Sequence, residues 1–299
     1  MRALCCLFAL SVSGAAVAQE VPCGGDFQAF KAKLQDEAVA MGHDPQVAQR
    51  FLSGAQQDSS VLRRDRAQGI FQTPFIEFSR KLISQDRLDR GRQLSQRWDE
   101  VFDRIERDYG ISRGVLLAFW AFETDYGAFQ GDFNTLDALV TLAHDCRRPE
   151  IFRPQIFSAM ELYERGDFDP DTTTGAWAGE IGMVQMLPKD ILENGMDGDG
   201  DGQVTLKSSA PDALLSGAKM LSELGWRHGE PWLQEVVLPA DMDLSLTGLE
   251  TTMSVAEWER LGVRAREGAL DDGRLEASIL LPQGRGGPSF IAYPNFRVY

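Results

Sequence analysis

The middle of the chain contains an almost uninterrupted apolar run, Val115-Leu116-Leu117-Ala118-Phe119-Trp120-Ala121-Phe122. Wound as a helix, this run is apolar on nearly all faces, which is typical of a helix buried at the centre of a domain. Ser112 is a favourable N-cap residue, so we expect the helix to begin there. Glu123 follows the run directly and is therefore expected at the end of the buried helix.

The residues before this run, from Asp26 to about Tyr109, have a helical pattern. The first helix is predicted to stop at Gly42, and Asp44-Pro45 is predicted to start the next one. Two apolar stripes at helical spacing support this reading, Phe27, Phe30, Leu34, Ala38 and Met41 in the first and Leu94, Trp98, Val101, Phe102 and Ile105 in the second.

Further helices are predicted after the run, at residues 134–142, 154–165 and 213–224, with a loop at 169–182. From Val236 onward the apolar runs are shorter, with Gly and Pro between them. Alternation at residues 278–281 and 289–293 predicts strands there. The sequence therefore predicts a mainly α (α+β) fold with a small β-containing C-terminal portion.

Composition narrows the class of protein. The 299 residues carry a formal net charge of -15, with 43% hydrophobic and 25% charged residues. This is the composition of a globular protein with its own core. The acidic balance argues against nucleic acid as a partner and against a polybasic membrane-surface protein.

The N-terminus has the pattern of a secretory signal peptide. An apolar run from Ala3 to Val12 is followed by Ala16-Val17-Ala18, an A-x-A cleavage site. The run is shorter than the about 20 apolar residues of a membrane anchor, which is the alternative reading. We therefore expect removal of residues 1–18, export, and no transmembrane segment.

The cleaved chain keeps two of the four cysteines, Cys23 and Cys146. In an exported protein, an even number of cysteines favours a disulfide. Such a bond would tie the mature N-terminus to a point far along the chain. The alternative is a pair of free buried thiols.

Glu123 is the first candidate for chemistry. Trp120, Phe122 and Tyr126 flank it in sequence, so its carboxyl is expected to be poorly solvated and its pKa raised. A carboxylic acid that stays protonated near neutral pH can donate to the leaving oxygen of a glycosidic bond. The plain alternative is a partly exposed glutamate at a helix end beside core aromatics.

A second candidate segment, residues 175–188, is rich in Gly and small residues, which allow the backbone to approach a ligand closely. Within it, Gln185 offers donors and acceptors for sugar hydroxyls and amides, and Trp177 offers a ring that could stack on a pyranose. The alternative is a glycine-rich connector whose apolar side chains pack inside.

A third segment, residues 197–204, matches the first eight positions of an EF-hand calcium loop. Asp197, Asp199 and Asp201 are the candidate ligands for a structural calcium ion. Position twelve is Ser208 instead of the usual Glu, and Asp212 could close a longer loop. The alternative is an Asp/Gly-rich turn without a metal.

Taken in order, these segments resemble the lytic murein transglycosylase B family of bacterial cell-wall enzymes, from about Phe27 to the end of the chain. The resemblance rests on an ordered set of motifs: Val61 to Asp65, Glu-Thr-x-Tyr-Gly at 123–127, Trp-Ala-Gly at 177–179, Gly182, Gln185, Pro188, the Asp-Gly run leading to Asp212-Ala213, Leu224 to Trp232, Gly287 to Phe290, and Asn295-Phe296.

The resemblance implies a lysozyme-like catalytic core embedded in a helical framework. It also implies cleavage of the MurNAc–β-1,4–GlcNAc bond without water, to give 1,6-anhydro-muropeptides. Glu123 would act first as acid and then as base, and no cofactor would be required. By similarity, Gln185, Trp177, Met186 and Tyr126 would bind the saccharide.

On this basis the predicted organisation has four parts: the signal peptide at 1–18, an N-terminal helical region at 19–110, the catalytic core at 111–235 with its Asp/Gly-rich loop at 197–212, and a small β-containing portion at 236–299 that is shorter than the family pattern. Other departures are Ala176 and Lys189, where Ser is usual, and Glu180, where a small residue is usual.

The expected protein is a monomeric periplasmic enzyme that acts on peptidoglycan glycan strands, with cell-wall synthesis proteins as candidate partners. Two alternatives stay open. A hydrolytic muramidase would need a second carboxylate to hold water, for which Asp125 and Glu180 are candidates. A non-catalytic peptidoglycan-binding protein is favoured by the short C-terminus and Ala176.

Overall fold

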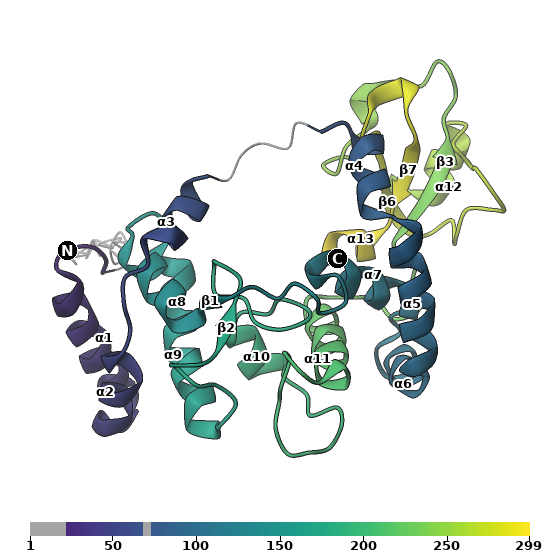
Figure 1. The fold of residues 1–299 in the computed structure, drawn as a ribbon. Helices are drawn as coiled ribbons and strands as arrows, with labels where there is room; N and C mark the ends of the chain where they lie inside the picture. The colour runs from purple at the N-terminus through teal and green to yellow at the C-terminus, as the bar shows by residue number, and fades with distance from the viewer. Residues whose placement is uncertain (1–21, 68–72) are drawn as a thin grey trace, which may run out of the picture.

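The computed structural model describes residues 22–67 and 73–299, so the predicted signal peptide at 1–18 lies outside the described residues. Helices dominate the described chain (Figure 1). The helices of the first half are α1 (Phe27–Met41), α2 (Pro45–Ser53), α3 (Ser59–Arg66), α4 (Phe75–Leu82), α5 (Gln85–Arg97), α6 (Asp99–Tyr109), α7 (Arg113–Thr124), α8 (Thr135–His144) and α9 (Pro149–Arg165).

The second half adds shorter helices and the strands. The helices are α10 (Pro188–Asn194), α11 (Ala210–Glu223), α12 (Val255–Arg260) and α13 (Pro294–Val298), with 3-10 turns at Leu244–Leu246 and Gly284–Gly286. The strands are β1 (Phe133–Asn134), β2 (Thr174–Gly175), β3 (Leu233–Val237), β4 (Met253–Ser254), β5 (Arg264–Ala265), β6 (Glu276–Leu280) and β7 (Ser289–Ala292).

The predicted start and stop signals of the first two helices are confirmed. The carboxylate of Asp26 accepts a hydrogen bond from the backbone N–H of Ala29 (2.8 Å), which caps α1. Gly42 ends α1 in the left-handed region at φ 107°, and Asp44 caps α2. Helices α1 and α2 pack with α8 and α9 around a first core that includes Phe30, Phe51 and Ile156.

The second predicted stripe belongs to two helices, not to one. Trp98 leaves the helical conformation at φ -111° and ψ 31°, so α5 ends at Arg97 and α6 begins at Asp99. The break is only one residue long, so the apolar spacing continues across it. The apolar sides of α5 and α6 therefore pack on the same core. Together with α7 and α11 they enclose a second core, in which Phe102 and Leu116 are fully buried.

The C-terminal part forms the expected β structure, beginning at Leu233. Its five strands are ordered β4-β6-β7-β3-β5, and all neighbouring strands in this sheet pair antiparallel. Helix α12 covers the sheet through Trp258, which is 0% exposed and donates its indole N–H to the carbonyl of Ala277 (2.9 Å). A third core thus holds this part together.

The arrangement in space joins segments that are distant in sequence. Helices α1 to α3 lie with α8 and α9 at one end of the molecule, and the sheet lies near α4 to α7 at the other (Figure 1). The region predicted as one unit, residues 19–110, thus supplies helices to two separate cores. Helix α13 brings the end of the chain back beside α7.

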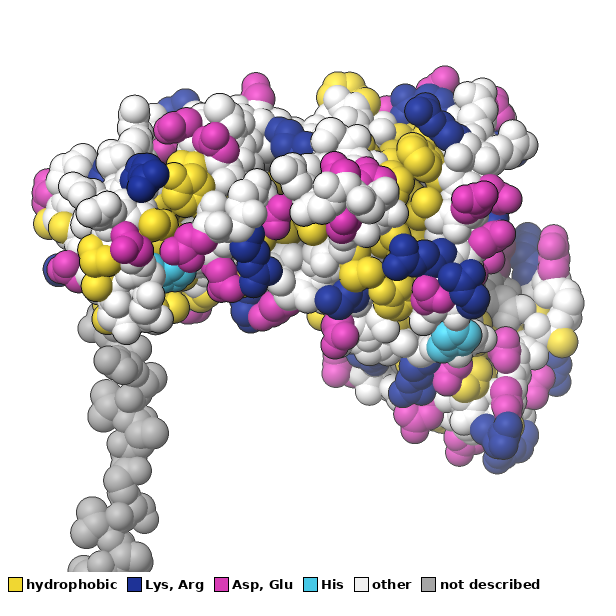
Figure 2. Space-filling model, turned by 90° about the horizontal axis from the view of Figure 1, so that it is seen from below, with side chains coloured by type: hydrophobic (Ala, Val, Ile, Leu, Met, Phe, Trp, Pro, Cys, Tyr) yellow, Lys and Arg dark blue, Asp and Glu magenta, His cyan; other side chains and the backbone are white. Residues whose placement is uncertain are grey.

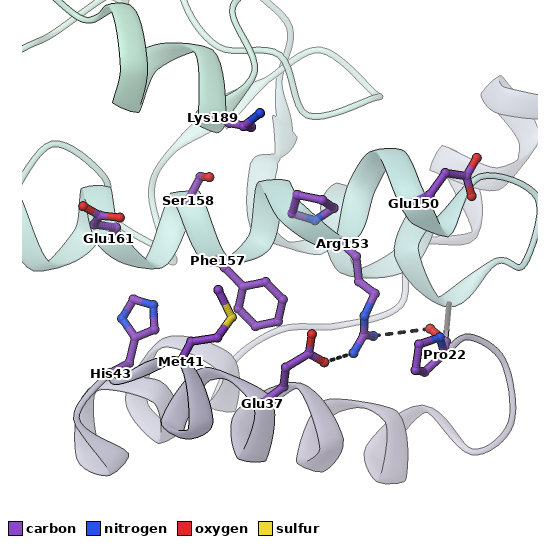
Figure 3. A pocket seen from close by; sticks show the side chains of 11 residues that line it. Pro22, Glu37, Met41, His43, Glu150, Arg153, Phe157, Ser158, Glu161 and Lys189 are labelled. Carbon is purple, nitrogen blue, oxygen red and sulfur yellow. Dashed lines mark hydrogen bonds and ion pairs between the residues drawn. The ribbon is translucent and has the colours of Figure 1, made fainter. Parts of the chain in front are cut away.

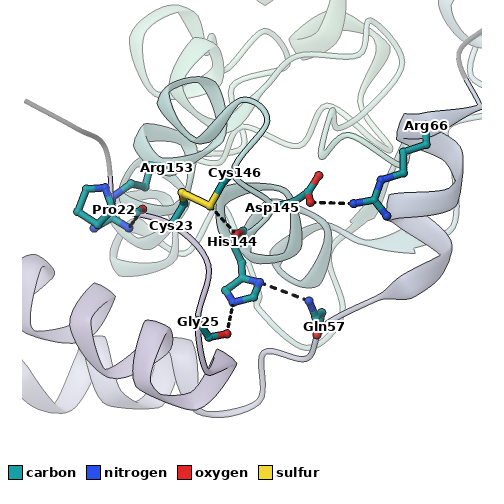
Figure 4. The surroundings of a disulfide bond; sticks show 9 residues. All are labelled: Pro22, Cys23, Gly25, Gln57, Arg66, His144, Asp145, Cys146 and Arg153. Carbon is teal, nitrogen blue, oxygen red and sulfur yellow. Dashed lines mark hydrogen bonds and ion pairs between the residues drawn. A yellow bond between two sulfur atoms is a disulfide. The ribbon is translucent and has the colours of Figure 1, made fainter. Parts of the chain in front are cut away.

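The predicted disulfide between Cys23 and Cys146 is confirmed, with the two Cα atoms 5.3 Å apart. Backbone and side-chain contacts support it (Figure 4). The N–H of Gly24 donates to the carbonyl of His144 (2.9 Å), and Nε2 of His144 lies 3.0 Å from the carbonyl oxygen of Gly25. The bond therefore fixes the residues before α1 against the end of α8.

Among the helices of the described residues, none has the length and apolar character needed to cross a bilayer.

Candidate active site

Glu123 lies in the last turn of α7 at an exposed position. The helix is buried on one side, through residues such as Leu116 and Trp120, but Phe122 is 43% exposed, so the prediction of a helix buried on nearly all faces is wrong. The helix ends because the N–H groups of Asp125 and Tyr126 donate back to the carbonyls of Ala121 (3.0 Å) and Trp120 (3.2 Å), a closed left-handed cap. A rigid helix end therefore presents the carboxyl of Glu123 to the solvent.

The turn after Glu123 is held in an unusual backbone conformation. Asp125, Tyr126 and Gly127 have φ values of 52°, 60° and 85°, and left-handed conformations are unfavourable for the two non-glycine residues. Thr124, which is buried, fixes the turn from inside. Its hydroxyl donates to the carbonyl of Met183 (2.6 Å) and accepts from the N–H of Gly127 (2.9 Å).

The pKa of the Glu123 carboxyl is raised, as the sequence predicted. Burial raises its pKa, and the nearby charge of Glu180 raises it further. Its place at the C-terminal end of a helix acts the same way, because the helix dipole disfavours an anion there. Glu123 is thus the kind of carboxyl that keeps a proton to donate.

Asp125 has a different environment, although only one residue separates it from Glu123. Its carboxylate accepts a hydrogen bond from Arg87 (3.0 Å), and Arg90 lies 2.9 Å away. Burial raises the pKa of Asp125, but these two arginines outweigh burial and lower it. Asp125 is therefore an ionised carboxylate whose charge is already paired, which orders the turn behind Glu123.

The glycine-rich segment forms a tight loop against α7, as the small residues predicted. A Cβ on Gly182 would meet Cβ of Leu206 at 2.5 Å, and the φ of Gly182 is 82°, so glycine is required there. Gln185 also has a positive φ, 51°, and its amide donates to the carbonyl of Gly182 (2.8 Å). The Thr124–Met183 hydrogen bond attaches this loop to the residue next to Glu123.

The other predicted binding residues differ in their exposure. Trp177 is half-buried and packs on the first core. Met186 is 1% exposed inside that core, so its side chain supports the loop instead of facing solvent. The ring of Tyr126 packs edge-on against Trp120, and its hydroxyl donates to the carbonyl of Arg87 (3.0 Å). Tyr126 therefore joins α5 to the turn behind Glu123.

Tyr299 is a neighbour of Glu123 that the sequence did not predict. Its ring contacts Phe119 of α7 and Trp232, with ring centroids 6.1 Å and 5.4 Å away. Burial, with a further contribution from the charge of Glu123, raises the pKa of Tyr299 to about 12. Tyr299 is thus a neutral phenol beside the carboxyl. Phe119, Trp232 and Tyr299 are far apart in the sequence, so no local sequence pattern predicts that they lie together.

The Asp/Gly-rich loop gathers carboxylates, but not the three that were predicted. Oxygens of Asp197, Asp199 and Asp212 lie within 4.8 Å of one another. Asp201 is outside this group, and its carboxylate instead accepts from the N–H of Gln203 (2.9 Å). Asp212 is 0% exposed and also accepts from the N–H groups of Gly198 (2.8 Å) and Thr205 (2.7 Å). The loop is therefore closed by Asp212.

These three aspartates suit a hard cation. Ca²⁺ takes carboxylate and carbonyl oxygens in a flexible loop, and grouped carboxylates without a cation repel one another. The buried Asp212 gives the group a fixed anchor at the start of α11. The geometry thus fits a calcium ion that stabilises the loop, at a distance in sequence from Glu123.

A large cavity lies elsewhere, and its lining includes none of the predicted site residues. It has a volume of about 730 Å³ and lies between α1 and α9 (Figure 3). Arg153 crosses it, pairing with Glu37 and donating to the carbonyl of Pro22 (3.3 Å). A second cavity of about 470 Å³ lies between α5 and α7 and includes Tyr126. Glu123 lines neither of these two cavities.

Charge on the surface is mixed. On the face that Figure 2 shows, Lys and Arg side chains are interspersed with Asp and Glu. That face lacks the continuous basic area of a nucleic-acid-binding surface.

Comparison with known proteins shows which family this chain matches and which protein it resembles in sequence. The family described as "Transglycosylase SLT domain" matches residues 26–299. The chain is 26% identical over 290 residues to membrane-bound lytic murein transglycosylase B of Escherichia coli (strain K12), which covers 91% of this chain and 78% of that protein.

Solved structures agree in fold. SltB3 from Pseudomonas aeruginosa, in complex with NAG-NAM-pentapeptide, matches with a TM-score of 0.85 at 33% identity, covering 92% of this chain and 74% of that chain. The Escherichia coli lytic transglycosylase Slt35, in complex with calcium, matches with a TM-score of 0.79 at 26% identity, covering 93% of this chain and 89% of that chain.

Proposed function

The chain belongs to the transglycosylase SLT domain family, and from that membership we propose that Glu123 cleaves peptidoglycan glycan strands without water. The protein is a lytic transglycosylase, like its relatives. The observation that carries the specific proposal is the carboxyl of Glu123, with its raised pKa, at an exposed position in the last turn of α7.

The reaction needs one carboxyl that works twice. The protonated Glu123 donates its proton to the oxygen of the MurNAc–GlcNAc bond, and the C1–O bond breaks. The resulting carboxylate then takes the proton of the C6 hydroxyl of MurNAc, whose oxygen bonds to C1 and closes the 1,6-anhydro ring. Proton gain and loss balance, so water is not consumed. The attack is intramolecular and gains from proximity.

The surrounding residues would hold the sugar in place. Gln185 lies on the loop that Thr124 attaches to Glu123, so its amide is a suitable partner for saccharide hydroxyl or acetamido groups. Trp177 is half-exposed and offers a stacking surface. In this proposal Tyr126 and Met186 support the site without contacting the sugar, because their side chains are packed in the protein.

The first test is the mass of the products. Incubation of the protein with murein sacculi is expected to release muropeptides that each lack one water compared with hydrolysis products. Reducing-end products would favour the muramidase reading. Binding to sacculi without release would favour the non-catalytic reading. Of the two carboxylates considered for a water-holding role, Asp125 is already paired with arginines, which disfavours it.

We also propose that Asp197, Asp199 and Asp212 hold a structural calcium ion. Ca²⁺ at a free concentration roughly 100 times its Kd is expected to stabilise the fold by about 3 kcal/mol, because it binds only the folded loop. Thermal unfolding with Ca²⁺ and with a chelator measures this effect as a change in Tm.

The matched variants separate the loop from general effects of charge. Asp212→Asn is expected to remove most of the calcium-dependent rise in Tm, and Asp241→Asn, at an exposed position after the sheet strand β3, is expected to keep it. An equal rise in wild type and in Asp212→Asn would rule out this calcium site.

The location follows from the chemistry of the substrate and the chain. Peptidoglycan lies outside the inner membrane, and a disulfide is stable in an oxidising compartment. The related Escherichia coli protein is a membrane-bound lytic murein transglycosylase. We place this protein in the periplasm, as a monomer on glycan strands, with cell-wall synthesis proteins as partners.

A further inference from the structure

Thr124 is a polar residue at a position where its helix otherwise buries apolar side chains. It is 1% exposed, and it directly follows Glu123, which occupies an exposed position. The other residues that α7 buries are apolar: Val115, Leu116, Trp120 and Ala121. Burying a hydroxyl is unfavourable unless it makes hydrogen bonds, so its partners determine what Thr124 contributes to the structure.

The hydroxyl of Thr124 reaches out of its own helix. A threonine inside a helix can bond to the carbonyl four residues earlier, but here that carbonyl, of Trp120, is 3.5 Å away. The carbonyl of Met183 lies at 2.6 Å and takes the single hydroxyl proton. The hydroxyl oxygen in turn accepts from the N–H of Gly127 (2.9 Å). One side chain thus joins the end of α7 to the turn at Gly127 and to the glycine-rich loop at Met183.

The loop side of this contact is fixed by hydrogen bonds of its own. The N–H of Met183 donates to the carbonyl of Leu206 (2.9 Å). The backbones of Ile181 and Met186 pair in both directions, at 2.8 Å and 3.1 Å. These bonds do not involve α7, so the loop is expected to keep Gln185 in place when the hydroxyl is removed.

The turn side depends more on the hydroxyl. Asp125 and Tyr126 have φ values of 52° and 60°, which non-glycine residues keep only where the surrounding contacts enforce them. The pairing of Asp125 with arginines of α5 fixes the turn to that helix and not to the loop. A second hydrogen bond between turn and loop is longer, from Nε2 of Gln185 to the carbonyl of Gln130 (3.4 Å). Without the short bond of Thr124, the end of α7 is therefore expected to shift relative to the loop.

We propose that Thr124 is a positioning residue, whose hydroxyl sets the distance between the carboxyl of Glu123 and the loop that holds the sugar through Gln185. This inference rests on the proposed function of Glu123. In this role Thr124 contacts neither the substrate nor the reacting atoms, and it acts only through the placement of Glu123. The acid works only when its proton is within hydrogen-bond reach of the glycosidic oxygen, so a small displacement lowers turnover more than binding.

Removal of the hydroxyl tests this role. Thr124→Val has nearly the same shape and is expected to lower kcat on murein sacculi by about 10–100-fold, because a displacement of about 1 Å can cost about 100-fold in rate. KM and binding to sacculi are expected to stay within about threefold of wild type, since the loop keeps its own hydrogen bonds. Thr124→Ser retains a hydroxyl and is expected to keep kcat within about threefold of wild type.

A matched variant separates this effect from the loss of any buried hydroxyl. Thr141 of α8 is 0% exposed, and its hydroxyl accepts from the N–H of Asp58 (2.8 Å). Thr141→Val is expected to lower the Tm, as Thr124→Val does, and to leave kcat unchanged. Both variants lose a buried hydrogen bond, so a difference in kcat between them reports on the placement of Glu123.

A second pair of variants keeps the test decisive if Thr124→Val does not fold. Thr124→Cys and Thr124→Ser differ only in the sulfur or oxygen of one small side chain, and a thiol is a weak donor. Thr124→Cys is therefore expected to turn over sacculi several-fold more slowly than Thr124→Ser, with equal binding. Equal turnover of these two variants would overturn the role of the hydroxyl.

The outcomes are separable from the failure of the proposed function. Wild-type kcat in Thr124→Val, or an equal loss of kcat in Thr141→Val, overturns only the role of Thr124 when wild type gives anhydro products and depends on Glu123. A rise in KM with unchanged kcat also overturns it, because the hydroxyl would then serve binding. Absence of products from wild type, or full activity of Glu123→Gln, is a failure of the proposed function itself.

Discussion

Replacing Glu123 with Gln is expected to lower the turnover of murein sacculi by about 10³-fold, because the amide can neither donate a proton to the glycosidic oxygen nor remove one from the C6 hydroxyl. Both halves of the reaction depend on this one group, so the loss should appear in kcat more than in binding. Release of soluble muropeptides measures it. The substitution preserves the size and shape of the side chain at an exposed position, so the fold is expected to persist.

The control for this variant is that it keeps its fold and its binding to sacculi and loses only catalysis. Glu123→Gln is expected to bind sacculi and to unfold at nearly the same temperature as wild type. Asp125→Asn changes the next carboxylate along the chain, which is paired with Arg87 and Arg90, and should lose less activity. Turnover of Glu123→Gln within a few fold of wild type would exclude Glu123 as the acid and base.

The largest expected effect on stability belongs to the disulfide. The Cys23→Ser, Cys146→Ser double variant is expected to lose about 2–4 kcal/mol of unfolding free energy, because the bond joins positions 123 residues apart and restricts the unfolded chain. Urea unfolding of the oxidised wild type and of the double variant measures the difference. Catalytic activity below the unfolding transition should be retained, because the bond joins the residues before α1 to the end of α8, at the end of the molecule opposite to α7 (Figure 1).

Reduction provides an independent check on this value. Wild type treated with a reductant should unfold like the double variant, and the double variant should not respond to the reductant. The remaining contacts between Gly24, Gly25 and His144 are expected to hold the N-terminal segment only weakly. Equal stability of oxidised wild type and the double variant would show that these contacts suffice without the bond.

Local signals in the sequence were enough for the helices that begin and end at strong caps. Asp26, Gly42 and Asp44 were predicted as boundaries, and each satisfies backbone groups at a helix end in the structure. The small C-terminal sheet was predicted from alternating residues, and β6 and β7 lie where that alternation occurs. These features depend on neighbours within a few residues.

Boundaries that depend on packing were less predictable. Helix α9 begins at Pro149, whereas the sequence predicted a start at Pro154. Proline is favoured at the first position of a helix, so either proline could have marked the start. Pro154 lies inside the helix, where burial of Phe152 and Ile156 compensates for the missing N–H bond. The break at Trp98 likewise has no glycine or proline to announce it.

The site shows the same division. Glu123 was predicted because its aromatic neighbours and its motif are local, and the raised pKa agrees with the expected direction. Asp212 replaced Asp201 in the acidic group because the loop closes through the buried start of α11, which spacing alone does not reveal. Tyr299 reaches Glu123 only because α13 folds back beside α7, a tertiary contact without a local signal.

The central claim is cleavage without water. Its most direct test is to digest sacculi in water enriched in ¹⁸O and to determine, by mass spectrometry, the masses of the muropeptides that carry the newly formed muramoyl ends. Intramolecular attack by the C6 hydroxyl predicts anhydro ends that carry no heavy oxygen, because no water enters the product. Incorporation of one heavy oxygen at each new end would mean that water attacks C1. That result would contradict the transglycosylase mechanism proposed for Glu123.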